Sequence, residues 1–216
     1  MDITQAQARR ASSRAVGVAG LATVVLTFAG AFLSIAGGSP EPDPGSPDSA
    51  VTDSLTSRNA TVFAFGSYLV VLGMVGLLWF AAGLSGALRR AAPYQDWMPS
   101  VVLAAGAAVA GTMLVGNFEI AASTTDSAAA VAFFRSGSLE MVNSVLAMGS
   151  LALAAGVAIV RGRIGPAWLG WWAIVAGVGL IAGRAVWTIS LWWFPYILLW
   201  LWIIVVGVRM LTGRRV

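Results

Sequence analysis

The chain has 216 residues, of which 58% are hydrophobic and only 10% are charged, and its formal net charge is +4. Soluble domains carry about 25% charged residues, so this composition indicates a membrane protein. The sequence contains no Cys, no His and no Lys. These absences exclude disulfides, thiolate metal sites, histidine-ligated haem, Ser–His hydrolysis and lysine Schiff-base chemistry.

Six apolar segments follow one another along the chain, at residues 16–37, 61–88, 101–122, 139–160, 167–190 and 192–211. A helix needs about 20 residues to cross the hydrocarbon of a bilayer, and each segment is long enough. Backbone groups in lipid must be paired within their own segment, which favours helices. The sequence therefore predicts an all-α fold, a six-transmembrane-helix bundle forming a single domain over residues 1–216.

Arginine placement predicts the orientation of this bundle. With the N-terminus inside, ten of the thirteen arginines fall on the inner side and only Arg58, Arg135 and Arg184 on the outer side. The positive-inside rule then predicts two cytoplasmic termini and a multi-pass protein of a cell (inner) membrane. Exclusive use of Arg, with abundant Ala, Gly and Val, favours a bacterial source. A cleaved signal peptide in the first segment is the alternative for the N-terminus.

Two outer loops differ in composition. Residues 38–59 are rich in proline and acidic residues, with few apolar groups to bury, so a flexible or polyproline-like loop is expected. Residues 123–137 include AAAVAFF, which predicts a short interfacial helix or a shallow re-entrant piece. A small-residue stripe in the third segment (Ala104, Ala108, Thr112, Gly116) favours packing within the chain, with a homodimer or another membrane partner as the alternative.

Polar residues near the outer ends of three segments form the candidate site. At 1.5 Å per residue, Glu119, Arg184 and Glu140 lie roughly 27, 27 and 31 Å above the inner boundary, so they share one depth. Asn117 and Asn143 are nearby, and the spacing of Asn143 from Glu140 places both on one helix face. We predict that Arg184 pairs with Glu119 or Glu140. A structural ion pair, separate interfacial residues, and a ligand or ion site remain open as explanations.

The segment RGRIGPAWLGWWAIVAGV, residues 161–178, resembles a signature of uncharacterised bacterial six-span integral membrane proteins, a domain-of-unknown-function family. The order of features is similar as well: a basic N-terminus, a variable first outer loop, an acidic residue late in the third span and a polar start to the fourth. The resemblance implies the fold and topology of that family. It implies no activity.

The function classes that remain are few. A non-enzymatic accessory, sensing or assembly component with an outward-facing polar site is favoured; the alternative is a small-solute or ion transporter or channel that uses Glu119, Glu140 and Arg184. No catalytic residue, metal site or cofactor is predicted, because the spans contain no paired Asp and the chain has no P-loop or metal-ligand cluster. No nucleic-acid partner is predicted either, because membrane topology accounts for the arginines. The prolines sit at segment ends, so no broken helix is expected. A polar cavity reaching the cytoplasm would favour transport, and a dry interior would favour the accessory role.

Overall fold

The computed structural model describes residues 3–38, 42, 46–91, 97–185 and 193–213, and within them the secondary structure is entirely helical. The helices, in chain order, are α1 (Ile3–Ala36), α2 (Asp48–Thr56), α3 (Ala60–Ala91), α4 (Trp97–Met113), α5 (Asn117–Ser123), α6 (Ser127–Gly162), α7 (Ala167–Ala185) and α8 (Trp193–Leu211).

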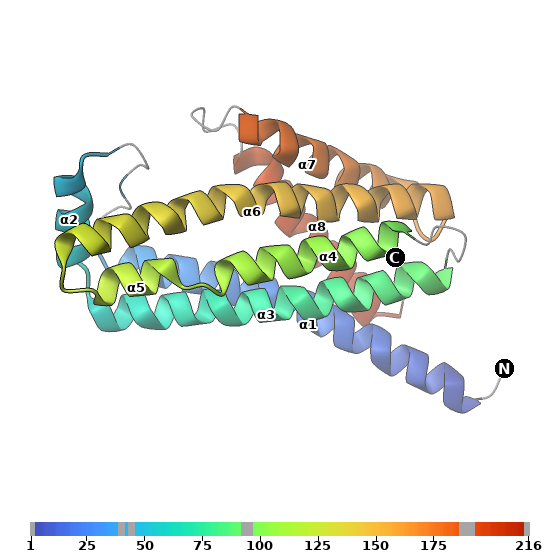
Figure 1. Ribbon diagram of the computed structural model, residues 1–216. Helices are drawn as coiled ribbons and strands as arrows, with labels where there is room; N and C mark the ends of the chain where they lie inside the picture. The colour runs from blue at the N-terminus through green and yellow to red at the C-terminus, as the bar shows by residue number, and fades with distance from the viewer. Residues whose placement is uncertain (1–2, 39–41, 43–45, 92–96, 186–192, 214–216) are drawn as a thin grey trace.

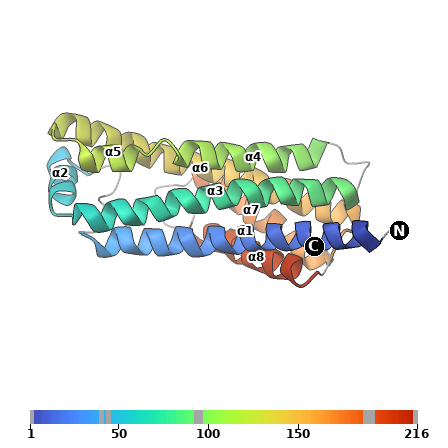
Figure 2. The ribbon, with the colours of Figure 1, turned by 90° about the horizontal axis from the view of Figure 1, so that it is seen from below.

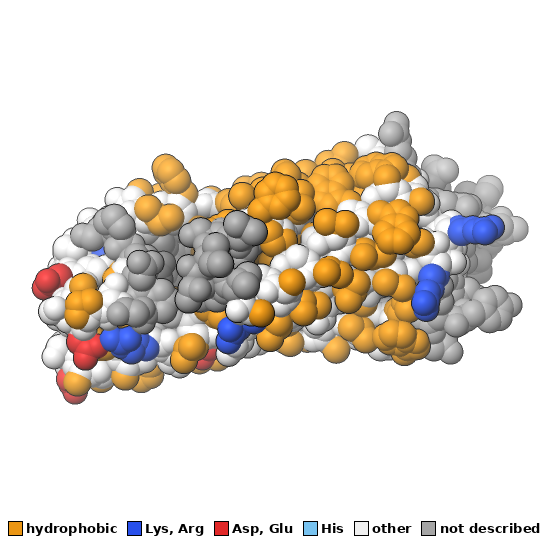
Figure 3. All heavy atoms as spheres, turned by 90° about the horizontal axis from the view of Figure 1, so that it is seen from above, with side chains coloured by type: hydrophobic (Ala, Val, Ile, Leu, Met, Phe, Trp, Pro, Cys, Tyr) orange, Lys and Arg blue, Asp and Glu red, His pale blue; other side chains and the backbone are white. Residues whose placement is uncertain are grey.

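The long helices form a bundle in which successive long helices run in opposite directions (Figures 1 and 2). α1 packs against α3 and α8, whereas α6 packs against α4, α5 and α7. α2 and α5 lie at one end of the bundle, which we name the α2 end; the helix ends nearest both chain termini lie at the other, which we name the terminal end. On the face in Figure 3, hydrophobic side chains cover the middle, and the acidic side chains gather at the α2 end.

Five helices are long and apolar enough to cross a membrane: α1 from Ala11 to Ala36, α3, α6, α7 and α8. This set fits a multi-pass membrane protein. α4 is apolar but has only 17 residues. α3 and α6 have 32 and 36 residues, about 48 and 54 Å at the α-helical rise, which exceeds the roughly 30 Å of hydrocarbon. Both helices are therefore longer than the hydrocarbon layer is thick.

The predicted third segment, residues 101–122, is not one helix. α4 ends at Met113, and Gly116 adopts the left-handed conformation (φ 71°, ψ 29°) at the N-cap of α5. A residue with a Cβ rarely adopts this backbone, and Gly adopts it freely. The expectation of an unbroken helix was wrong because it considered only prolines. Those do sit at helix starts: Pro99 and Pro195 lie in first turns, and Pro166 directly precedes α7.

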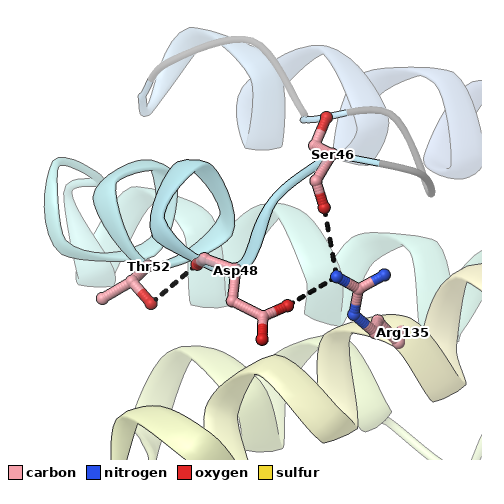
Figure 4. A network of polar contacts seen from close by, with 4 residues as sticks. All are labelled: Ser46, Asp48, Thr52 and Arg135. Atoms are coloured by element: carbon pink, nitrogen blue, oxygen red, sulfur yellow. Dashed lines mark hydrogen bonds and ion pairs between the residues drawn. The ribbon is translucent and has the colours of Figure 1, made fainter.

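Part of the predicted flexible loop, residues 38–59, is the ordered helix α2. Val51 is only 1% exposed and packs with Ala121 and Phe134, near the α5–α6 connection. The Arg135 side chain of α6 contacts Asp48 at 2.5 Å and donates a hydrogen bond to the Ser46 carbonyl at 3.1 Å (Figure 4). The loop was expected to have little to bury, but one valine on the inner face of α2 and an ion pair are enough to dock it.

The second outer connection is also shorter than predicted. α6 begins at Ser127, where the carboxylate of Asp126 caps the helix by accepting the Ala128 N–H at 2.9 Å. Residues 128–134 are the first turns of this long helix, so they form neither a separate interfacial helix nor a re-entrant piece. The last predicted segments match α7 and α8, and residues 186–192 lie outside the described part.

Glycines set the closest helix contacts. A Cβ at Gly177 of α7 would meet the backbone of Gly149 on α6, and Gly170 and Gly156 face each other in the same way one heptad further along. Close backbone approach at small residues is the usual packing mode of membrane helices. The stripe predicted on α4 does not work this way, because Ala104 and Ala108 are exposed and the face around Val102, Ala105 and Val109 packs inward.

Candidate functional site

A cavity of about 260 Å³ lies inside the bundle near the α2 end. Its walls come from α1, α3, the α4–α5 junction, α6 and the first turn of α8, together with Arg58 from the turn between α2 and α3. A single water needs only about 10–15 Å³ of such space, so the cavity is many times larger than one water requires. This is room for a small molecule rather than for a single ion.

Asn117 and Glu140 meet at the polar side of the cavity. The Asn117 Nδ2 donates to the Glu140 Oε1 at 2.6 Å and to the Ser136 Oγ at 3.3 Å. Asn117 is 8% exposed and Glu140 is half-buried. The left-handed Gly116 directly precedes Asn117, so the break between α4 and α5 lies beside this hydrogen bond. The broken helix thus brings an amide to a carboxylate on α6.

Arg58 supplies the opposite charge. Its Nη2 donates to the Ser54 Oγ at 3.2 Å, and its guanidinium carbon lies 4.8 Å from the ring centroid of Phe63. Ser54 and Phe63 are both buried, and stacking on an aromatic ring fixes a guanidinium without neutralising it. From the sequence, Arg58 is expected on the outer side but not in the site. The one sequence feature that could have indicated its role is a single cation five residues before the aromatic residue Phe63.

The deeper part of the cavity is largely apolar, and Thr27 is one of the hydroxyl-bearing residues in the lining. Met74, Val145 and Met148 line it together with Thr27 of α1. Glu140 and Met148 are eight residues apart on α6, so the cavity extends about 12 Å along the helix axis. Thr27 is 7% exposed, and its Oγ1 has no hydrogen-bond partner within the described structure. An unsatisfied buried hydroxyl costs about 1–3 kcal/mol, so it is a candidate ligand contact.

The bundle is tightly packed between this cavity and the terminal end. Buried side chains from four helices fill the interior there, each no more than 2% exposed: Leu77, Phe80 and Leu84 of α3, Val102 of α4, Leu151 of α6 and Trp202 of α8. The Trp202 indole donates to the Leu169 carbonyl at 2.9 Å, so even its polar atom is satisfied internally. A second cavity at the terminal end shares no lining residue with the first.

Of the predicted site residues, Asn117 and Glu140 are brought together, and Asn143 is not part of the cavity. Asn143 is exposed. The cavity side of α6 carries Met141 and Val145, and at about 100° per residue Asn143 points some 160° away from each of them. Glu119 belongs to α5, but its side chain lies outside the described part of the structure.

Arg184 is at the predicted depth but on the wrong side of α6 to reach Glu140. The Gly149–Gly177 and Gly156–Gly170 contacts give an antiparallel register that places Arg184 level with residue 142. Gly149 is nine residues from Glu140, so the α7 side of α6 is about 180° from the Glu140 side. No described carboxylate forms an ion pair with Arg184, and its Nε is buried without a partner there. The predicted Arg184–Glu140 pair is therefore absent.

Fold and site together define a helical bundle with five membrane-length helices and an internal polar–apolar cavity. In the described residues no group of three or more Asp or Glu is placed to hold a metal ion. The chain matches no protein-family model, and no curated protein or solved structure is significantly similar to it. The resemblance to six-span proteins of unknown function stays a prediction.

Proposed function

We propose that this chain is a non-enzymatic, multi-pass component of a bacterial cell membrane that senses or presents a small amphiphilic ligand bound in the cavity near the α2 end. The observation that carries the proposal is the pairing of a polar rim, with Glu140 and Arg58, and an apolar interior within one cavity. Concave sites with a few convergent polar groups are the usual form of small-molecule sites.

The rim chemistry favours a dipolar head group. Glu140 retains lone pairs beyond the bond from Asn117, and an ammonium group is the natural donor to them. Arg58 presents N–H donors suited to a carboxylate or phosphate. A ligand carrying both charges contacts both side chains favourably, whereas a singly charged ligand does so with only one of them. Met74, Val145 and Met148 then accept a short aliphatic tail.

The tightly packed interior supports a binding role over transport. A path across the bilayer would have to pass Phe80, Leu84 and Trp202, which are all buried and belong to one hydrophobic cluster. A ligand that enters the cavity therefore meets a closed floor. Its binding energy can act on the α4–α5 junction, which lines the cavity at Gly116 and Asn117. We propose that this junction passes the bound state on to a partner protein in the membrane.

The orientation proposed from the arginines places the α2 end outside the cell and both termini in the cytoplasm. α3 and α6 then project beyond the outer boundary, and Glu140, 21 residues from Arg161 on the same helix, lies near that boundary. The cavity rim would thus be at lipid–water depth, where a molecule with a charged head and an aliphatic tail concentrates.

The test compares three eight-carbon probes on the full chain in lipid nanodiscs: N-octylglycine, octylammonium and octanoate. N-octylglycine is expected to raise the melting temperature most, because it alone carries both an ammonium and a carboxylate group. A ligand that binds only the folded state stabilises it by about 2.7 kcal/mol at a concentration of a hundred times Kd. Glu140→Gln should remove the preference for N-octylglycine over octanoate. Asn143→Gln, on the outer side of the same helix, is the matched control and should retain it.

Three results would overturn this proposal. The first two are no stabilisation of the wild type by any probe and an unchanged ranking of the probes in Glu140→Gln. Loss of the preference in Asn143→Gln as well would reassign the effect to the surrounding lipid, and it would overturn the cavity as its origin.

A transporter is the second candidate function, and one observation favours it. The helix break at Gly116 lines the cavity, and interrupted membrane helices commonly form substrate sites in transporters. Proteoliposome uptake of N-octylglycine that vanishes in Glu140→Gln would establish transport. Binding without uptake is the result we expect from the packed interior.

A further inference from the structure

A second cavity, of about 570 Å³, lies at the terminal end of the bundle, among α1, α3, the α6–α7 turn and α8. Its apolar floor includes Val16, Leu88 and Met210, which are 8, 1 and 3% exposed. Arg90, in the last turn of α3, and Arg163, after the last turn of α6, stand at its rim. This terminal cavity is therefore amphipathic, with positive charge above an apolar base.

The lining of the terminal cavity contains two cations and no carboxylate. The described acidic residues lie on α2, on α5, before α6 or at Glu140 in the α2 half of the bundle. Arg90 and Arg163 lie at the C-terminal ends of α3 and α6. Each helix dipole places only about half a negative charge there, so it offsets part of the charge of each arginine. The remaining charge of the arginines is left to be matched by something outside the described chain.

The backbone of Arg163 gives independent support. It is the one residue other than glycine with positive φ in the described part of the chain (φ 48°, ψ 38°), and its N–H caps α6 by donating to Ile159 and Val160 carbonyls. Glycine is the usual residue at such a left-handed helix end, because any Cβ is strained there. Glycines occupy positions 162 and 165 on either side. Glycine at position 163 would relieve this strain, so the presence of Arg163 indicates that its side chain has a function.

Nearby tryptophans indicate that the terminal cavity lies at the lipid–water interface. Trp97 in the first turn of α4 and Trp168 and Trp171 in the first turns of α7 are all more than half exposed at this end of the bundle. Indole rings concentrate at the head-group level of bilayers. A charged rim above an apolar floor at that depth fits a head group joined to an acyl chain.

We infer that Arg90 and Arg163 bind a net-anionic phosphate group at the terminal cavity, with the phosphate carried by an acidic phospholipid. Guanidinium groups contact phosphate oxygens through paired N–H donors, and two of them from different elements fix one phosphate. The floor around Val16, Leu88 and Met210 receives the first carbons of the acyl chain. Basic recesses between membrane helices on the cytoplasmic side recognise acidic head groups by this chemistry.

The test measures lipid retention by native mass spectrometry of the full chain extracted from nanodiscs of phosphatidylcholine with phosphatidylglycerol. Wild type should retain phosphatidylglycerol in preference to phosphatidylcholine. Arg163→Gly should lower that preference about tenfold, equal to about 1.4 kcal/mol, and Arg90→Gln should do the same. Arg163→Gly also removes the left-handed strain, so it is expected to fold at least as well as the wild type. Arg161→Gln is the matched control, since Arg161 is exposed in the same turn and does not line the cavity.

A parallel arm titrates inorganic phosphate into protein in nanodiscs of phosphatidylcholine alone. Thermal stabilisation by inorganic phosphate that disappears in Arg163→Gly would support the same anion site with soluble phosphate as its occupant. Equal retention of both lipids by the wild type, with no effect of inorganic phosphate, would overturn the inference. An equal loss in Arg161→Gln would do so too, because it would show a diffuse attraction to basic residues instead of a site.

Discussion

Thr27 offers the sharpest test of the cavity, because its hydroxyl should lower stability when no ligand is bound. The side chain is 7% exposed and its Oγ1 lacks a hydrogen-bond partner within the described structure. Thr27→Val keeps nearly the same shape and removes the unsatisfied oxygen. Desolvation of an unpaired hydroxyl costs about 1–3 kcal/mol, so the substitution should raise the free energy of unfolding by about 1 kcal/mol or more.

Thr23, one turn earlier on α1, is the matched control. It is fully buried, and its Oγ1 donates to the Ala19 carbonyl at 2.7 Å. Thr23→Val removes a satisfied hydroxyl, and side-chain hydrogen bonds in membrane proteins average about 0.6 kcal/mol. The two substitutions should thus change stability in opposite directions. Unfolding by SDS in mixed micelles measures the change in unfolding free energy of both variants.

The same variant also separates a structural role of Thr27 from a binding role. If the hydroxyl contacts the ligand, Thr27→Val should weaken stabilisation by N-octylglycine while it strengthens the free protein. Destabilisation of Thr27→Val by as much as Thr23→Val would refute the reasoning, because it would mean that the Thr27 hydroxyl is satisfied in the membrane.

Three further predictions concern the packing that surrounds the sites. Gly177→Val should destabilise the protein by about 1–3 kcal/mol in the same SDS assay, because the added Cβ would meet the α6 backbone. Gly111→Ala should be neutral or stabilising, because nothing lies within 4 Å of a Cβ added there. Gly116→Ala should lower the free energy of unfolding by about 1–2 kcal/mol, because Gly116 has a left-handed backbone. It should also weaken N-octylglycine binding, measured by calorimetry in nanodiscs. Unchanged binding would show that the α4–α5 break does not shape the site. Arg135→Gln should reduce global stability by less than about 1 kcal/mol, since the pair with Asp48 is exposed, yet it should speed hydrogen exchange across α2; unaltered exchange would show that Val51 alone docks that helix.

How far the sequence predicts the site is clearest from Glu140 and Arg184. The rise of an α-helix gave their depths, and the register of α6 and α7 agrees with that estimate. The direction of each side chain around its helix was not available from depth alone. Glu140 turns toward Asn117 and the cavity, while Arg184 belongs to a helix packed on the opposite side of α6. Arg58 lies in the turn between α2 and α3, and the path of this turn could not be predicted from the sequence.

Hydrophobic length and composition by themselves determined that the chain is helical, where most of its long helices lie and which ends carry the prolines, since those properties depend on local backbone pairing and on burial in an apolar medium. Tertiary structure decided the break at Gly116, the docking of α2 by Val51 and Arg135, and the partner that Glu140 meets. Each of these depends on contacts between residues far apart in the chain. A local pattern fixes the depth of a residue along a helix axis, whereas its neighbour across the bundle is fixed only when the helices pack.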